Sequence, residues 1–165
     1  MKNLTLISLL TVIIMFTSCS KDNNSAAYLA VSVRVVVKDS LGNDLLDPDN
    51  RKGLDTDNIK IFHVKDGIAE QYFAGNLDHP KGYNIYKPED FPNCEEYSIS
   101  ILLNSKETED SPTTLVQWQK NDIDTIVAEY KRVPGYLAIT KATFNGEEKW
   151  QGRSEDSEPF FEIIK

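Results

Sequence analysis

Residues 28–43, YLAVSVRVVVKDSLGN, decide the fold class expected for this chain. Apolar side chains alternate there with small or polar ones, at Leu29, Val31, Val33, Val35 and Val37. Alternation with a period of two is typical of a strand that buries one face. The stretch from Asp39 to Asn43 then favours a turn, because Asp, Ser, Gly and Asn are common turn residues.

The same pattern of strand and turn continues to the end of the chain. Asp66-Gly67 and Asn145-Gly146 are strong signals for two-residue hairpins. No segment after the first 27 residues has a helical apolar stripe, and no alternation of strands and helices indicates a parallel α/β sheet. We therefore predict one all-β domain over 28–165, an antiparallel β-sandwich. Further strands are expected at 58–64, 68–73, 83–86, 97–103, 113–119, 123–131, 136–144, 147–150 and 159–164.

The N-terminal segment has the pattern of an export signal. Lys2 precedes an apolar run from Leu4 to Phe16, and the small residues Thr17 and Ser18 precede Cys19. The run is shorter than the roughly 20 residues that span a bilayer. The ending resembles the lipobox of bacterial lipoproteins, although Phe16 replaces the commoner leucine. The resemblance implies cleavage of residues 1–18 as a signal peptide and attachment of palmitate-type acyl chains to Cys19. An ordinary cleaved signal is the alternative.

Residues 19–27 are expected to form a polar tether between the lipid and the domain. Ser20 stands where aspartate would resemble an inner-membrane retention signal, so we expect an outer-membrane lipoprotein of the cell envelope. The stretch 20–24 also resembles the surface-export tags of Bacteroidetes lipoproteins, which would place the protein at the cell surface. A merely solvated tether is the alternative interpretation.

Composition excludes some partners. The chain of 165 residues carries 18 basic and 26 acidic side chains, a formal charge of −8. Cleavage before Cys19 would remove Lys2 alone, leaving 17 against 26, or −9. Such an acidic chain without a basic cluster is a poor ligand for nucleic acid. Lipidation of Cys19 would leave Cys94 without an intramolecular disulfide partner.

Three features together resemble the small, uncharacterised β-sandwich lipoproteins of gut Bacteroidetes. They are the lipobox, the valine-rich first strand that leads into KDSLGNDLLDPDN, and the ending ITKATFNGEEKW with FFEIIK. The valine-rich strand followed by an Asp-x-x-Gly turn is also similar to transthyretin-like and carboxypeptidase-regulatory-like domains. The resemblance implies an Ig-like or transthyretin-like sandwich and a place in the envelope. It implies no functional residue.

Two groups of residues are weak candidates for a ligand site. Asp47, Asp49, Asp55 and Asp57 lie in an acidic loop and carry the oxygen ligands that Ca²⁺ prefers. However, Arg51 takes a ligand position and no closing Glu follows, so the EF-hand pattern fails. Trp118 and Trp150 could belong to an aromatic surface for a sugar or a protein, although aromatic side chains are more often core residues.

The sequence contains no recognisable motif for a zinc site or a catalytic serine. The two histidines, His63 and His79, have no Cys or His partner at zinc-ligand spacing. No Gly-x-Ser-x-Gly elbow is present. We therefore predict a lipid-anchored, non-enzymatic protein that binds or scaffolds, without a cofactor. Its partners would be the membrane, through the lipid, and a glycan or an envelope protein. A glycan-binding surface lipoprotein is the alternative, followed by an envelope hydrolase or a pilus-related subunit.

Overall fold

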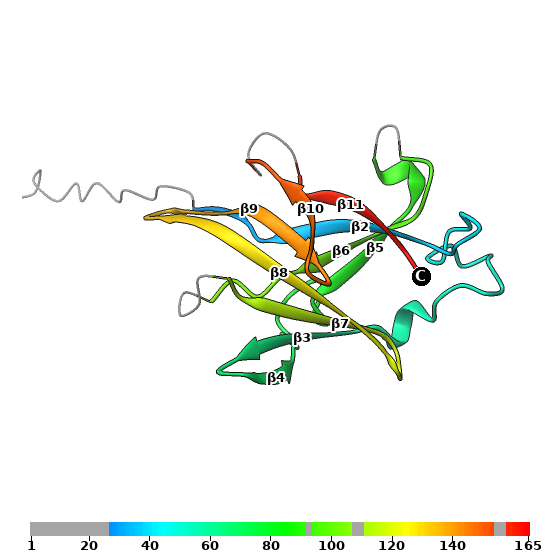
Figure 1. The fold of residues 1–165 in the computed structure, drawn as a ribbon, viewed down its shortest axis with the longest axis horizontal. Coiled ribbons are helices and arrows are strands. Elements are labelled where there is room, and N and C mark those ends of the chain that lie inside the picture. The colour runs from blue at the N-terminus through cyan, green and yellow to red at the C-terminus, as the bar shows by residue number, and fades with distance from the viewer. Residues whose placement is uncertain (1–26, 92–93, 107–110, 154–157) are drawn as a thin grey trace, which may run out of the picture.

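The structure is a computed structural model that describes residues 27–91, 94–106, 111–153 and 158–165. It is all-β, with two sheets that face each other in an open, sandwich-like arrangement (Figure 1). One sheet has the order β1-β9-β8-β7-β3-β4, with β10 also paired to β9, and the other has the order β11-β2-β6-β5. We call them the large sheet and the small sheet.

The bounds of the strands follow the sequence pattern closely. The large sheet contains β1 (Tyr28–Ala30), β3 (Lys60–Lys65), β4 (Ile68–Gln71), β7 (Thr113–Gln119), β8 (Asp122–Val133), β9 (Tyr136–Phe144) and β10 (Glu147–Gln151). The small sheet contains β2 (Ser32–Lys38), β5 (Tyr83–Tyr86), β6 (Ser98–Leu102) and β11 (Phe160–Ile164). Two short 3₁₀ helices, η2 (Thr56–Asn58) and η3 (Pro88–Asp90), lie in the connections. Both predicted hairpins are confirmed, since Asp66, Gly67, Asn145 and Gly146 all have positive φ angles between 50° and 85°.

The valine-rich segment does not form one strand. β1 pairs with β9 in the large sheet, whereas β2 pairs with β6 and β11 in the small sheet. The chain changes sheet at Val31, whose carbonyl oxygen accepts a hydrogen bond of 2.9 Å from the amide N–H of Leu103. One continuous pattern of alternation therefore supplies strands to both layers.

The prediction of a purely antiparallel sandwich is wrong at two edges. β1 runs parallel to β9, and β11 runs parallel to β2. Both parallel strands come from the two ends of the domain and join distant parts of the chain. Local turn signals specify antiparallel hairpins and contain no information about such pairings.

The core lies between the sheets and follows the period of two. Val33, Val35 and Val37 of β2 are fully buried, as are Ile99 and Ile101 of β6. The large sheet contributes Ile61, Val116, Trp118, Ile126 and Ile139, all fully buried. The inward residues of the predicted strands therefore supply most of the core, to which Leu45 and Leu46 of the loop after β2 also belong.

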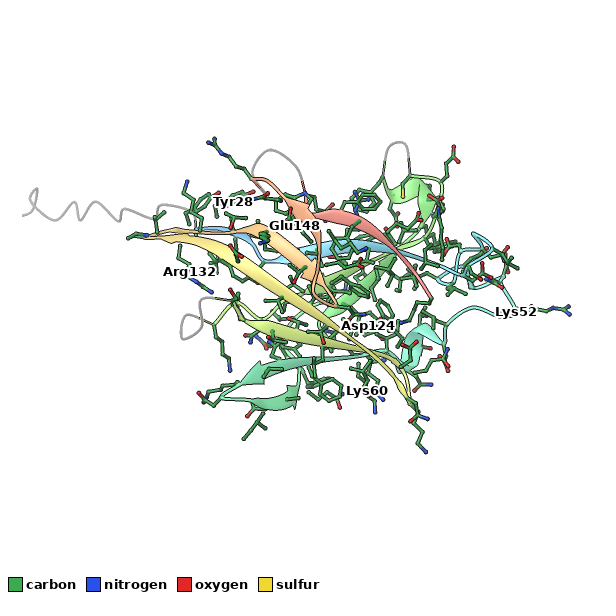
Figure 2. The ribbon with its side chains drawn as sticks, viewed as in Figure 1. Tyr28, Lys52, Lys60, Asp124, Arg132 and Glu148 are labelled. Atoms are coloured by element: carbon green, nitrogen blue, oxygen red, sulfur yellow. The ribbon has the colours of Figure 1, made fainter. Side chains whose placement is uncertain are left out.

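A partly buried ionic cluster lies at the edge of this core, near the turn between β7 and β8 (Figure 2). The indole N–H of Trp118 donates to Asp124 Oδ2 at 2.8 Å, and Asn145 Nδ2 donates to Asp124 Oδ1 at 2.8 Å. Lys165 Nζ lies 2.6 Å from Asp124 Oδ2 and 2.7 Å from Asp122 Oδ1. The cluster thus joins β7, β8, the β9–β10 turn and the residue after β11.

The opposite end of the sandwich is joined by side chains that hold residues 102–106. Asn104 Nδ2 donates to the carbonyl oxygen of Val64 at 2.8 Å, and the hydroxyl of Tyr130 donates to the carbonyl oxygen of Asn104 at 2.8 Å. Arg132 Nη1 donates to the carbonyl oxygen of Ser105 at 2.9 Å. Burial raises the pKa of Tyr130, which keeps its hydroxyl a donor at neutral pH.

None of the helical segments in the described part of the chain has the length and apolar character needed to span a bilayer. Cys19 and the predicted signal peptide and tether up to residue 26 lie outside the described residues.

Candidate functional site

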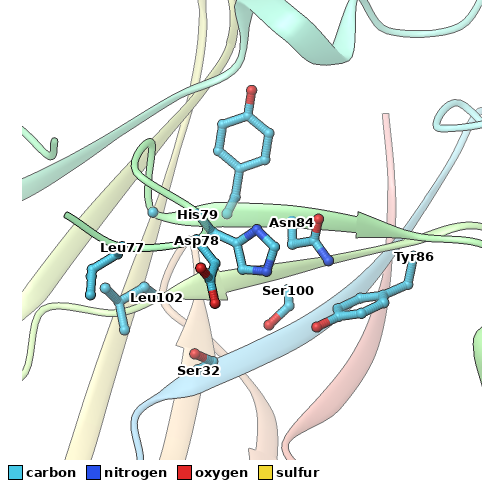
Figure 3. Close-up of a pocket in the computed structure, with 10 residues that line it drawn as sticks. Ser32, Leu77, Asp78, His79, Asn84, Tyr86, Ser100 and Leu102 are labelled. Atoms are coloured by element: carbon cyan, nitrogen blue, oxygen red, sulfur yellow. The ribbon is translucent and has the colours of Figure 1, made fainter. Parts of the chain in front are cut away.

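The candidate site is a pocket of about 330 Å³ on the small sheet, beside the loop that precedes β5 (Figure 3). Strands β2, β5 and β6 supply one part of its lining, and the loop supplies the rest. The polar lining residues are Ser32, Asp78, His79, Asn84, Tyr86 and Ser100. The less polar ones are Leu77, Gly82, Tyr83 and Leu102.

Apart from Tyr83, which packs against the core, the strand residues of the pocket come from the face of the small sheet that points away from the core. Ser32 precedes buried Val33, and Ser100 lies between buried Ile99 and Ile101. Asn84 is paired with Ser100 across β5 and β6. Neighbouring residues of a strand point to opposite faces. The alternation that builds the core therefore also places these polar groups together on the outside.

The loop that carries Asp78 and His79 is tied to the strands by backbone hydrogen bonds. The carbonyl oxygen of His79 accepts from the amide N–H of Gly82 at 3.0 Å, and the carbonyl oxygen of Gly82 accepts from Leu102 at 2.8 Å. Gly82 has a φ of 80°, and a Cβ there would lie 2.7 Å from Tyr72 Cδ1. Glycine is therefore needed at this corner, which directs the loop back across the end of β6.

Tyr86 forms a supported aromatic wall of the pocket. Its ring meets the ring of Phe91 edge to face, with centroids 5.0 Å apart. The guanidinium carbon of Arg34 lies 3.8 Å from the centroid of Phe91 and 4.9 Å from that of Phe160. Arg34 Nε also lies 3.0 Å from Glu158 Oε2. These aromatic and cation–π contacts fix the position of the Tyr86 ring.

The pocket offers hydrogen-bonding groups of several kinds. Figure 3 shows the Asp78 carboxylate, the His79 imidazole and the Asn84 amide facing the same space as the hydroxyls of Ser100 and Tyr86. A carboxylate accepts hydrogen bonds, whereas a side-chain amide and a hydroxyl can each donate and accept them. The arrangement suits a small polar ligand that has several donors and acceptors.

A hydrolytic centre would need a histidine joined to a serine and a carboxylate. His79, Asp78 and Ser100 line one pocket, but in the described part of the chain no hydrogen bond links either histidine to a serine or a carboxylate. His63 instead lies 3.2 Å, through Nε2, from the carbonyl oxygen of Leu102 and stacks against Tyr72. Burial lowers the pKa of His63 and favours its neutral form.

The two tryptophans that are candidates for a ligand surface differ in burial. Trp118 is 0% exposed, so the prediction that places it on such a surface is wrong. Its strand phase, shared with buried Thr114 and Val116, directs it into the core. Trp150 on β10 is half-buried and packs against the core with part of its ring exposed. Neither tryptophan lines the pocket on the small sheet.

Two of the four aspartates considered for calcium, Asp47 and Asp55, stabilise turns. Asp47 Oδ1 accepts a hydrogen bond from the amide N–H of Asp49 at 2.9 Å, and Asp55 Oδ2 accepts from Asn58 Nδ2 at 2.7 Å. Asp49 and Asp57 are exposed. Across the described ranges, no three His, Cys, Asp or Glu side chains are placed to hold a metal ion, so the structure does not bring these four aspartates together as a ligand set.

The pocket has no continuous sequence signature. Its residues come from 32, 77–86 and 100–102, and only the fold brings those segments together. Tyr83 and Tyr86 in an expected edge strand, next to His79 in a loop, were the available signal. No protein-family model, no curated protein and no solved structure matches this chain.

Proposed function

We propose that this chain is a lipid-anchored protein of the cell envelope that binds a ligand without converting it chemically. The pocket on the small sheet carries the proposal, because it gathers five polar side chains around the supported ring of Tyr86. The lipobox ending at Cys19 supports the envelope placement. In this proposal residues 1–18 are removed as a signal peptide, acyl chains on Cys19 hold the protein in the outer membrane, and residues 19–27 are the tether.

We also assign the sandwich to the Ig-like or transthyretin-like kind. The support is the Asp-x-x-Gly turn after the valine-rich strand. Asp39 Oδ1 accepts hydrogen bonds from the amides of Leu41 and Asn43, at 2.9 and 2.8 Å, and Gly42 has a φ of 83°. The turn has the local geometry that its sequence predicts.

The anchor is tested by replacing Cys19 with serine. Cys19→Ser removes the only thiol that the lipobox offers for acylation, so the protein should leave the membrane fraction and appear in the soluble fraction. Fractionation of cells followed by immunoblotting measures this. Cys94→Ser is the matched control and should stay with the membrane. Retention of Cys19→Ser in the membrane at the level of the unaltered chain would contradict the proposed anchor.

Glycan binding is the second candidate function, with the pocket on the small sheet as the binding site. The favouring observation is the combination of the Tyr86 ring with Asp78 and Asn84, whose planar polar groups can bond adjacent sugar hydroxyls. Sugars also stack on aromatic faces, so a held tyrosine ring supplies the apolar contact.

The glycan candidate predicts binding on a glycan array that depends on the pocket. Asn84→Ala and Tyr86→Ala should each weaken the affinity about tenfold, which corresponds to about 1.4 kcal/mol, the scale of one lost hydrogen bond or stacking contact. Trp150→Ala, on the other sheet, should leave the affinity unchanged. The candidate is refuted if no glycan binds, or if Trp150→Ala abolishes binding while both pocket variants retain it.

A further inference from the structure

One end of the sandwich carries exposed apolar side chains where the described chain begins. Leu29 on β1 is 66% exposed, and Val133 at the end of β8 is 51% exposed. The backbone joins these two segments, since the amide N–H of Tyr28 donates to the carbonyl oxygen of Gly135 at 2.9 Å. We call residues 27–31 and 130–137 the tether end of the domain.

Aromatic and basic groups surround these apolar side chains. The rings of Tyr28 and Tyr136 stack, with centroids 5.1 Å apart. Lys131 Nζ lies 5.2 Å from the centroid of Tyr136, and the guanidinium of Arg132 lies 4.8 Å from that of Tyr130. An open hollow of about 510 Å³ lies between β1 and the β8–β9 turn.

The charge of the tether end differs from that of the whole chain. Its two segments contain Lys131 and Arg132 and no Asp or Glu, whereas the chain has a formal charge of −8. Glu107, Glu109 and Asp110 lie outside the described residues, so this comparison covers the two segments alone. Tyrosine rings beside apolar side chains, with long basic side chains near them, are typical of protein at a lipid–water interface.

The distance to the predicted lipid is short. Seven residues lie between Cys19 and Ala27, which makes eight steps along the chain, and a fully extended chain spans at most about 3.6 Å per step, or about 29 Å here. Figure 2 shows Tyr28 and Arg132 at this end of the domain and Lys52 at the opposite end. If Cys19 is acylated, the chain joins the lipid to this end of the domain and keeps the two within that length.

We propose that the tether end rests on the phospholipid surface, with Leu29 and Val133 entering the headgroup region. Tyr28 and Tyr136 lie at the interface, and Lys131 reaches the lipid phosphates. The contact orients the domain, and the acyl chains hold it. The acidic loops around Lys52 then face away from the membrane. This inference rests on the proposed lipid anchor.

Fluorescence quenching by brominated lipid tests the orientation. The lipidated protein is reconstituted in vesicles of zwitterionic phosphatidylcholine, with or without bromine on the acyl chains. Val133→Trp places an indole at the tether end, and Leu41→Trp is the matched control at the far end, where Leu41 is 82% exposed. After subtraction of the signal from Trp118 and Trp150, brominated vesicles should quench the indole of Val133→Trp at least twofold and leave that of Leu41→Trp unchanged.

The outcomes separate this inference from the anchor. If the unaltered protein does not sediment with vesicles, the anchor itself fails. If it sediments but Val133→Trp is not quenched, or both variants are quenched equally, the proposed orientation is wrong. A blue-shifted, unquenched Val133→Trp in a dimer would show that a second copy covers the end instead. Leu29→Trp repeats the measurement from β1 in case Val133→Trp does not fold.

Discussion

Replacing Trp118 with alanine is expected to lower the free energy of unfolding by about 4 kcal/mol, the scale measured for large-to-small changes in aromatic core residues. Trp118 is 0% exposed and is the largest fully buried side chain in the described core. Its removal leaves a cavity between the sheets and deprives Asp124 of the indole N–H, 2.8 Å away. Because small domains have only about 5–15 kcal/mol of stability, a large share of the protein would unfold under mild denaturant. Chemical denaturation followed by circular dichroism measures the change.

Two further variants distinguish packing from hydrogen bonding at Trp118. Trp118→Phe keeps most of the buried apolar volume but removes the donor, so it should cost about half as much as alanine. Trp150→Ala removes a half-buried ring and should also cost less than Trp118→Ala. A loss below about 1 kcal/mol for Trp118→Ala would mean that the indole does not fill the core as described.

Replacing Asp124 with alanine is expected to lower the free energy of unfolding by about 3 kcal/mol, at the lower end of the range for a broken buried ion pair. The carboxylate accepts from Trp118 and Asn145 and pairs with Lys165 at 2.6 Å. The variant leaves the donors of Trp118 and Asn145 without this acceptor. Lys165 keeps Asp122 at 2.7 Å, which limits the loss. Asp122→Ala is the matched control, since its side chain is 40% exposed, and it should cost less than 1 kcal/mol by the usual scale for exposed pairs.

The same carboxylate predicts a dependence of stability on pH. Burial by itself would raise the pKa of Asp124, but the hydrogen bonds from Asn145, Lys165 and Trp118, together with the Lys165 charge, outweigh burial and hold that pKa below its ordinary value. An acid whose folded pKa is below its unfolded value, about 3.9, stabilises the fold above that pH. Its contribution declines as the pH falls through 3.9 toward the folded pKa.

Unfolding midpoints measured between pH 2 and pH 7 check this dependence. The unaltered chain should lose stability below about pH 4 more steeply than Asp124→Ala does, so the difference between the two should shrink in acid. A constant difference over the whole range would show that the Asp124 carboxylate does not supply the stability.

The strands could be predicted from sequence because each is specified locally. Leu29, Val31, Val33, Val35 and Val37 recur with a period of two, and Asn145-Gly146 provides the left-handed turn that a hairpin needs. The parallel pairs, β1 with β9 and β11 with β2, could not be predicted, since they join segments over a hundred residues apart without a local signal. The change of sheet at Val31 could not be predicted either, because the apolar alternation continues without a break from β1 into β2.

The candidate site was harder to predict than the fold. Ser32, His79 and Ser100 carry no spacing that connects them, and their proximity depends on the register of β2, β5 and β6. Trp150 is a candidate from the sequence because it follows a hairpin strand and precedes the polar run 151–158. However, Trp118 shares a strand face with buried Val116, and that phase already indicated a core position.

The change of sheet at Val31 has a mechanical consequence. A pull on the chain before Ala27 loads β1 first, and β1 is held to β9 by a register of only three residue pairs. β2 belongs to the other layer, where β6 and β11 hold it on both sides. Detachment of residues 27–30 would therefore lengthen the tether by four residues, about 14 Å, and leave the small sheet intact. The short first strand can act as an extensible link that yields under load before the domain unfolds.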